Sequence, residues 1–531
     1  MWLLPAFSGL SRFAARTFYR LETAGVRVPR TGPVLLVANH PNSLLDPALV
    51  AAAASRPVRF LAKAPLFKDP KIGWLVRGAG SIPVYRRVDD PSAVGRNDEM
   101  FRAVHTALAE GSAVGIFPEG ISHSEPSLAP LKTGAARIAL GAAPSVGGAF
   151  PIVPVGLCYR SKERFRSEAL ILVGEPVAWD DLAGGVDGAG GVGASPEAVR
   201  ELTRRIDAAL REATINLEQW EDAPLVEWAQ AIYAAEFQVD GTNGGAGAVD
   251  ASGPGSRVGA AVGREPGGMG TSEPRGVPAA YDAPATRNAP AARIARVREA
   301  AETLARLRRS GDTSWTAVAR DVSRHCRLLD QLRLQPDDLR ATPRASAAVV
   351  WTLRQLAYFV VGAPLAAVGV ATFYLPYRLT GIIEAASRPD LDRRSTYKAL
   401  YGALLHLAWI LALSAAAGWW LGWRVCIGAV VGLVLLGILT LSIRERWTDA
   451  LANARRHLLL RGRRTLHERL RVRQREIAER LRALRAEVVD IVAEAAGDAA
   501  GPAVSARSTA PSSDGATASS MVGAPEQGVN R

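Results

Sequence analysis

The sequence predicts an α/β domain, with a largely buried sheet flanked by helices, followed by a helical region and C-terminal transmembrane helices. Three observations predict this fold class. Between about residues 33 and 180, short β-rich apolar runs alternate with helical stretches, a pattern typical of a sheet covered on both faces. A Gly-, Ala- and Pro-rich stretch then separates this part from the rest of the chain. Beyond it lie three apolar segments of near-spanning length.

The composition narrows the possible functions. Its 531 residues exceed one ordinary domain, because single cores stop growing at about 250–300 residues. Lys and Arg number 64 against 51 Asp and Glu, so the net charge of +13 favours an anionic partner, either nucleic acid or a membrane surface. Three cysteines without a C-x-x-C pair argue against a thiolate zinc site and a disulfide-stapled secreted scaffold.

The first 30 residues predict an amphipathic interfacial helix. Large apolar residues alternate there with Arg12, Arg16 and Arg20 at helical spacing. A first helix that packs into the core remains an equal alternative. A signal peptide is disfavoured, because Pro5 and Arg12 interrupt the apolar run.

Residues 31–237 form the predicted catalytic domain. The expected strands are Val34–Ala38, Ala113–Phe117, Ile152–Val155 and Leu170–Val173. The expected helices are Asp98–Glu110, Leu131–Ala142 and a helix that Ser195 caps and that continues to about Glu236. We then expect a disordered linker at 238–290, a helical segment at 291–345 and a disordered tail at 499–531.

Residues 346–443 form the predicted membrane region. Segments 399–423 and 425–443 are predicted spans, separated only by Arg424 and bordered by interfacial Trp residues. Basic stretches on both sides place the ends of this hairpin in the cytoplasm. Segment 356–377 contains two prolines, and a third span would put the preceding domain on the opposite side. We therefore interpret it as re-entrant or interfacial, with a true span as the alternative.

Residues 444–498 are predicted to form an Arg-rich cytoplasmic helix. Fourteen Arg face five Asp or Glu between residues 444 and 485. Such juxtamembrane clusters bind anionic headgroups. Trp447 is the only aromatic residue there apart from two His, which disfavours nucleic-acid binding. A plain amphipathic or coiled-coil helix with Leu470 and Ile477 on its apolar side fits as well.

Candidate catalytic residues follow the first apolar strand. His40 comes just after Ala38, and Asp46 comes six positions later. A neutral imidazole can take a hydroxyl proton near pH 7, and a carboxylate on its other nitrogen fixes the tautomer. Taken alone, these two residues have an alternative interpretation, in which Asp46 caps a helix and His40 is unrelated to it. No metal-ligand spacing, nucleotide loop or dinucleotide fingerprint is present, so neither a metal nor a bound cofactor is expected.

Four sequence blocks occur in order: Asn39-His40 to Asp46, Gly80-Ser-Ile-Pro-Val-Tyr-Arg86, Phe117-Pro-Glu-Gly-Ile-Ser-His123 and Ile152-Val-Pro-Val155. Together they resemble the four motifs of the glycerolipid acyltransferases, which include glycerol-3-phosphate and lysophosphatidate acyltransferases. The resemblance covers roughly residues 20–235. The five residues between His40 and Asp46, where four are common, resemble a subgroup that acylates glycerol-3-phosphate or dihydroxyacetone phosphate and that includes the fungal microsomal enzymes.

The resemblance implies a role for each block. His40 would be the general base and Asp46 its partner, whereas Arg86 would bind the phosphate of the acceptor. The other residues implied in substrate binding are Asn39, Glu119, Gly120, Ser122, His123, Lys132 and Pro154. Many members carry Arg soon after Glu-Gly, where this chain has Ile121-Ser122-His123, so Lys132 or His123 would have to supply that phosphate contact.

The resemblance implies an O-acyltransferase of phospholipid biosynthesis. The apolar segments and the distribution of Lys and Arg predict that it is anchored in the cytoplasmic membrane with its catalytic domain facing the cytoplasm. Its donor would be an acyl thioester on coenzyme A or acyl carrier protein. Its acceptor would be glycerol-3-phosphate or 1-acylglycerol-3-phosphate. Its further partners would be anionic membrane lipids and not nucleic acid. The alternatives are an acyltransferase for another lysolipid and a non-enzymatic membrane scaffold with a relic acyltransferase domain.

Overall fold

The computed structural model describes residues 4–70, 73–86, 91–183, 195–237, 288–311, 313–340, 345–387, 391–462 and 464–499. The predicted linker and tail lie outside these ranges apart from residues 288–290 and 499. The chain divides into two compact units, Met1–Leu484 and Arg485–Arg531. In the second unit, only the end of one helix, residues 485–499, is described.

A seven-stranded sheet forms the centre of the predicted catalytic domain. Its spatial order is β1-β7-β6-β2-β5-β3-β4. Neighbouring strands are parallel except β6 and β7, which are antiparallel. The strands are β1 Tyr19–Gly25, β2 Val34–Ala38, β3 Val58–Lys63, β4 Ile82–Val84, β5 Ala113–Ile116, β6 Ile152–Tyr159 and β7 Ser167–Val173. The mixed α/β class that the sequence predicts is therefore present.

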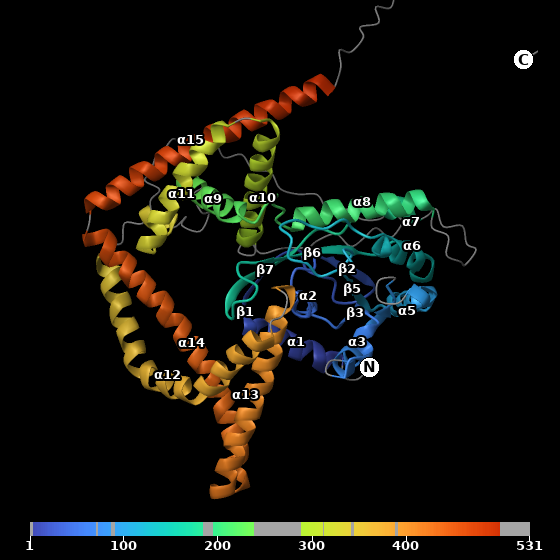
Figure 1. Cartoon of the computed structure of the whole chain (residues 1–531), viewed down its shortest axis with the longest axis horizontal. Helices are drawn as coiled ribbons and strands as arrows, with labels where there is room; N and C mark the ends of the chain where they lie inside the picture. The colour runs from blue at the N-terminus through green and yellow to red at the C-terminus, as the bar shows by residue number, and fades with distance from the viewer. Residues whose placement is uncertain are drawn as a thin grey trace, which may run out of the picture. The chain divides into compact units, whose positions relative to one another are not determined.

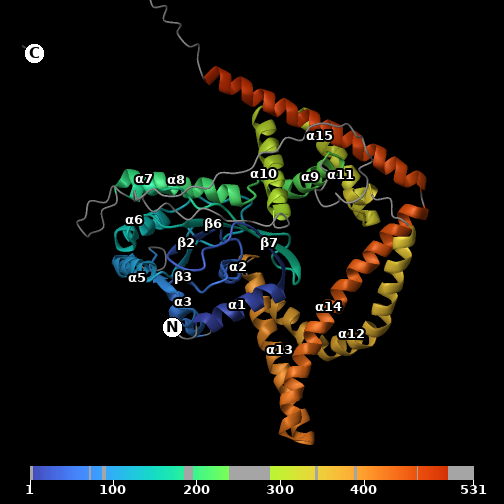
Figure 2. The same cartoon turned by 180° about the vertical axis from the view of Figure 1, so that it is seen from behind.

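Helices cover both faces of this sheet, as seen in Figure 1 and in the reverse view of Figure 2. On one face, α1 (Leu4–Phe18) and α2 (Leu45–Ala54) pack against Leu36 and Val153. On the other, α5 (Asn97–Ala109), α6 (Gly134–Val146) and α8 (Pro196–Ala213) pack against neighbours such as Leu35 and Ile152. Side chains alternate between the two faces of a strand, so a uniformly apolar strand such as β2 fills both layers.

The predicted helix of residues 1–30 is wrong in its extent. The helix α1 ends at Phe18, and residues 19–25 form β1, which pairs in parallel with β7 along its whole length. Only a partner 148 residues away in sequence makes this segment a strand. Ala15 and Phe18 are buried in the core, whereas Leu10 and Phe13 are 60% and 56% exposed. The C-terminal part of α1 thus packs into the core, whereas Leu10 and Phe13 remain exposed on the surface.

The predicted long helix after Ser195 is interrupted. The Oγ of Ser195 caps α8 by accepting a hydrogen bond from the N–H of Ala198, as expected. The helix ends at Ala213, and α9 begins at Asp222. The short helices of the domain are α3 Pro65–Lys68, α4 Gly73–Gly78, α7 Asp180–Ala183 and the 3₁₀ segment Pro91–Arg96.

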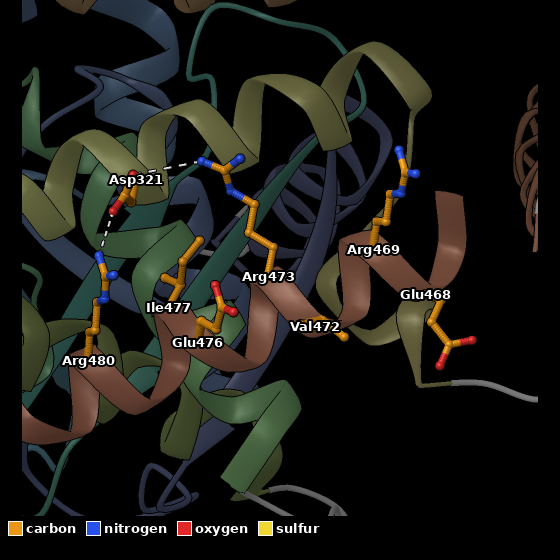
Figure 3. A pocket seen from close by; sticks show the side chains of 8 residues that line it. All are labelled: Asp321, Glu468, Arg469, Val472, Arg473, Glu476, Ile477 and Arg480. Atoms are coloured by element: carbon orange, nitrogen blue, oxygen red, sulfur yellow. Dashed lines mark hydrogen bonds and ion pairs between the residues drawn. The ribbon is translucent and has the colours of Figure 1, made fainter. Parts of the chain in front are cut away.

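A helical region follows, built from α9 (Asp222–Phe237), α10 (Asn288–Arg309), α11 (Ser314–Leu332) and α15 (Arg464–Ala499). Ile477 of α15 is buried against Val322 of α11 and Ile232 of α9. A charged cavity of about 460 Å³ lies beside this contact. Figure 3 shows Arg473 and Arg480 of α15, both pointing toward Asp321. The Arg-rich segment is therefore amphipathic, with one side packed and part of its charge paired.

Among the described residues, three helices are long and apolar enough to cross a membrane by length and composition. They contain the stretches Gly362–Ser387, Arg394–Leu421 and Trp423–Thr448. The complete helices are α12 Ala345–Ser387, α13 Leu391–Leu421 and α14 Trp423–Gly462. The predicted Arg-rich helix therefore does not begin as a separate element at residue 444, since α14 continues without a break to Gly462.

The helix α12 is unbroken but bent, and it contains Pro364 and Pro376, a known cause of helix kinks (Figure 1). Its neighbours in α13 and α14 change along its length. The contacts place Gly362 beside Ile443, Phe373 beside Gly437 and His406, and Glu384 beside Arg394. The middle of α12 therefore lies nearer the α13–α14 turn than both ends do, by roughly 9–18 Å at 1.5 Å per residue. The re-entrant or interfacial course of residues 356–377 stays a prediction, since α12 is also among the helices long and apolar enough to cross a membrane.

Both ends of the α13–α14 pair contact the catalytic domain. The Lys398 ammonium at the start of α13 donates a hydrogen bond to the Glu163 carbonyl at 3.1 Å. Near the end of the apolar part of α14, Glu445 forms an ion pair with Arg166 and lies 3.6 Å from Arg20. The turn at Gly422 makes no such contact in the part of the chain that the structure describes. This arrangement is that of a hairpin whose two ends lie on the side of the catalytic domain.

Candidate active site

The side chain of Asn39, the first predicted site residue, bonds the backbone of the neighbouring strand β6. Its amide Nδ2 donates to the Leu157 carbonyl at 3.1 Å, and its Oδ1 accepts from the Leu157 N–H at 2.7 Å. These two bonds imitate one more step of the β2–β6 ladder. Asn39 therefore aims the chain as it leaves β2, and its side chain is already engaged by the protein.

His40 and Asp46 are brought together as a hydrogen-bonded pair. The His40 Nδ1 lies 2.8 Å from Asp46 Oδ2. The Asp46 side chain is fully buried, and the His40 side chain is 19% exposed. A turn makes the pair possible, because Ser43 adopts a positive φ of 47° and folds residues 41–45 back toward the strand. Five intervening residues therefore suffice to place a carboxylate behind the ring.

The buried Asp46 carboxylate is fully supported by donors. The Asn42 N–H donates to Oδ2 at 2.7 Å, and the Tyr159 hydroxyl donates to Oδ1 at 2.6 Å. A buried carboxylate without such partners would be strongly destabilising. Burial, together with the charge of Asp46, raises the pKa of Tyr159 well above its usual value, so this phenol remains a donor. Sequence reasoning missed Tyr159; its one signal is a polar aromatic residue that ends an apolar strand.

Aromatic stacking fixes the plane of the His40 ring. Phe117, just after β5, stacks on the imidazole with centroids 4.0 Å apart and planes 12° apart, and Phe60 of β3 stacks behind it at 6.0 Å. Within the described part of the chain, His40 Nε2 has no hydrogen-bond partner. The ring is therefore held by its Nδ1 edge and its face, while Nε2 is left to meet a substrate.

Glu119 fastens the third block to the first. Its side chain is 1% exposed. Oε1 accepts from the His40 N–H at 2.8 Å, whereas Oε2 accepts from the Ala129 N–H at 2.8 Å and also bonds His123 Nε2. Both carboxylate oxygens are thus engaged within the protein. Glu119 acts on the site by holding the His40 backbone, and no oxygen is left for an acceptor.

Two cations converge on the turn beside His40. The Arg86 Nη1 donates to the Gly120 carbonyl at 3.0 Å. Gly120 has a φ of 70°, and a Cβ at that position would lie 2.9 Å from the Lys132 ammonium. The left-handed backbone at this turn favours glycine, and the missing side chain leaves room for the Lys132 side chain. Arg86 and Lys132 come from different segments and bring two cationic side chains to this turn.

The remaining predicted residues serve the scaffold. Ser122 Oγ accepts from the N–H of the strained Ser43 at 3.1 Å. His123 donates its backbone N–H to the His40 carbonyl at 3.2 Å, while its ring is bonded to Glu119. Pro154 is buried in the sheet opposite Val37, with its ring over Gly174. The structure thus gathers Ser122 and His123 at the site but not the Pro154 side chain.

Among the described residues, no group of three His, Cys, Asp or Glu residues is arranged to hold a metal ion. Burial raises the pKa of the Cys158 thiol, next to the fourth block, to about 11. It therefore stays protonated, which is unlike an activated nucleophile.

Residues 20–158 match the family model described as Acyltransferase. The chain is 37% identical over 141 residues to glycerol-3-phosphate O-acyltransferase 2 of Saccharomyces cerevisiae, which is 26% of this chain and 18% of the relative. Its identity to 1-acyl-sn-glycerol-3-phosphate acyltransferase of Bacillus subtilis is 34% over 128 residues, which is 24% of this chain and 57% of the relative. The chain therefore spans less than two thirds of both relatives.

A solved structure is also similar in part. It is the 1-acyl-sn-glycerophosphate (LPA) acyltransferase PlsC from Thermotoga maritima, at 18% identity and a TM-score of 0.29. The similarity covers 40% of this chain and 78% of that protein.

Proposed function

We propose that this chain, whose residues 20–158 match the Acyltransferase family model, transfers a fatty acyl group from acyl-CoA or acyl carrier protein to the hydroxyl of a phosphorylated glycerol in phospholipid biosynthesis. The observation that carries this proposal is the His40–Asp46 pair with Nε2 unpaired within the described part of the chain, beside the cations Arg86 and Lys132. The acceptor is glycerol-3-phosphate or 1-acylglycerol-3-phosphate. The yeast relative and the five-residue spacing favour glycerol-3-phosphate.

The chemistry needs no nucleophile from the protein. His40 Nε2 takes the proton of the acceptor hydroxyl as its oxygen attacks the thioester carbonyl. Asp46, bonded to Nδ1, stabilises the imidazolium that forms and holds its tautomer. The tetrahedral intermediate then expels the thiolate, which takes the proton from Nε2. One C–O bond forms, one C–S bond breaks, and the histidine returns to its neutral state.

The phosphate of the acceptor is held by Arg86 and Lys132. Arg supplies a fork of donors and Lys a mobile point charge, and both suit a phosphate dianion. Lys132 takes the place of the Arg that many family members carry after Glu-Gly. His123 is not used in this way, because its ring is bonded to the buried Glu119.

The enzyme works at the cytoplasmic membrane with its catalytic domain facing the cytoplasm. The apolar hairpin of α13 and α14 anchors it, and the exposed Leu10 and Phe13 of α1 add an interfacial contact. The arginines of residues 444–485 bind anionic headgroups. Amphiphilic products then leave directly into the bilayer.

The test is transfer by the purified full chain, in vesicles, of labelled acyl groups from acyl-CoA or acyl carrier protein to a panel of acceptors. We expect product with glycerol-3-phosphate or 1-acylglycerol-3-phosphate and none with plain glycerol. If acyl groups were transferred only to a phosphate-free lysolipid, the proposed phosphorylated acceptor would be wrong. The absence of transfer to every acceptor, from either donor, would favour the non-enzymatic scaffold.

The membrane topology is tested by cysteine labelling. In a background where Cys158, Cys326 and Cys426 are serine, single cysteines replace Ser92, Ser387, Gly422 and Ser505. In intact cells an impermeant reagent should label only the cysteine at residue 422, because both hairpin ends lie on the catalytic side. Labelling at residue 505 but not at residue 92 would mean an odd number of crossings, and α12 would then be a true span.

A further inference from the structure

The two oxygens of the buried Asp46 carboxylate have different partners. Oδ2 faces the His40 ring and the Asn42 N–H. The Oδ1 atom instead meets the Tyr159 hydroxyl at 2.6 Å. The length of this bond is that of a strong O–H···O⁻ hydrogen bond. The orientation of the carboxylate behind His40 is therefore set by Tyr159 as well as by the turn.

Tyr159 itself is held firmly. It is the last residue of β6 and pairs with Ala169 of β7. Its ring lies against that of Tyr19 at a centroid distance of 5.2 Å. The Tyr19 hydroxyl has other partners, since it donates to the Lys162 carbonyl at 2.5 Å and accepts from Asn42 Nδ2 at 2.7 Å. The two tyrosines thus pack together, but the Tyr159 hydroxyl bonds the Asp46 side chain whereas the Tyr19 hydroxyl bonds the Asn42 side chain.

We propose that Tyr159 is a positioning residue for the His40–Asp46 pair, acting through the carboxylate of Asp46. This inference rests on the proposed function. By donating to Oδ1, Tyr159 keeps Oδ2 in line with His40 Nδ1. By drawing charge toward Oδ1, it weakens the pull of the carboxylate on the imidazolium, so the proton taken from the acceptor is easily passed to the leaving thiolate.

The charged and titratable groups around the His40–Asp46 pair come from several segments. They are Tyr159 of β6, Tyr19 of β1, the Glu119–His123 pair after β5, Lys162 of the β6–β7 turn, and the cations Arg86 and Lys132 at the Gly120 turn. Of these, Tyr159 is the one whose side chain donates directly to Asp46 Oδ1. Removing its hydroxyl therefore changes the carboxylate without altering another formal charge.

The first test is Tyr159→Phe in the full chain in vesicles. We expect kcat to fall about tenfold, which is the scale of one hydrogen bond to a charged group, while the KM for the acceptor stays within twofold. The acid limb of the kcat/KM profile should move to higher pH by roughly 0.5–1 unit. Without the hydrogen bond from Tyr159, the Asp46 carboxylate stabilises the imidazolium form of His40 more strongly. A merely structural role would leave the position of this limb unchanged.

The matched control is Tyr19→Phe. It removes a hydroxyl from the same pair of rings, but this hydroxyl does not bond Asp46. The acid limb of this variant should therefore remain at the wild-type position. A limb that moves equally in both variants, or in neither, would overturn the proposal. In an Asp46→Asn background, Tyr159→Phe should add less than its full single-variant loss, whereas full additivity would also overturn it.

If Tyr159→Phe does not fold, 3-fluorotyrosine at position 159 provides the test, because it keeps the ring and strengthens the donor. The acid limb should then move to lower pH, opposite to the first variant. An unmoved limb would overturn the proposal. A fully active His40→Ala variant would instead overturn the proposed function, so the two failures are distinguishable in one assay.

Discussion

Acyl transfer in the His40→Ala variant is expected to fall by about 10²–10⁴-fold, while folding and membrane association persist. The base that takes the acceptor proton is removed, and nothing else in the described site offers an unpaired imidazole nitrogen. The side chain is 19% exposed and stacks on Phe117, and the Asp46 carboxylate that it bonds keeps its other donors, Asn42 and Tyr159. Steady-state transfer, with circular dichroism and vesicle flotation, checks both halves of this prediction.

The control for this variant is His105→Ala. His105 lies on α5 against Gly141 of α6, away from His40, and burial lowers its pKa, so it is a neutral packing residue. We expect lower stability but transfer within about threefold of wild type, the small change typical of a site remote from the chemistry. Full transfer in His40→Ala would refute the mechanism, as would an equal loss in both variants.

Arg86→Ala is expected to raise the KM for glycerol-3-phosphate by about 10–100-fold with little change in the KM for the acyl donor. One charged contact to phosphate, worth about 1.5–3 kcal/mol, accounts for this range. Arg86→Lys should recover only part of the loss, because a point charge does not replace the planar fork. Initial rates measured against each substrate in turn provide the comparison.

The same guanidinium also holds the Gly120 carbonyl, so a structural effect must be separated from phosphate binding. Arg102→Ala on the exposed side of α5 controls for the loss of an arginine. Lys132→Ala should raise the same acceptor KM. A loss that is equal for both substrates, or that appears with a phosphate-free acceptor, would remove Arg86 from the phosphate site.

Much of the α/β domain was predictable because its signals are local. The strands β2, β5 and β6 and the second half of β7 are continuous apolar runs, and the helix that begins after Ser195 carries its own cap. The strand β1 was not predictable. It is an edge strand with alternating polarity, and only its pairing with the distant β7 distinguishes it from the end of a helix.

The membrane region shows the same division. Length and hydropathy identify the apolar segments, and the distribution of Arg and Lys predicts the hairpin. The course of α12 is decided by its contacts with Gly437 and His406 in its middle and with Ile443 and Arg394 toward its ends. Such contacts between segments leave no periodic pattern in the sequence.

The sequence by itself determined which residues are chemically competent: His40 and Asp46 after a strand, and Arg86 in the second block. Only the tertiary structure decided how they act. The positive φ of Ser43 closes the five-residue gap between His40 and Asp46, and it depends on support from the distant Ser122. Glu119 and Tyr159 hold the pair across about 79 and 113 residues of chain, a range over which long-range packing, and not local spacing, sets which side chains meet.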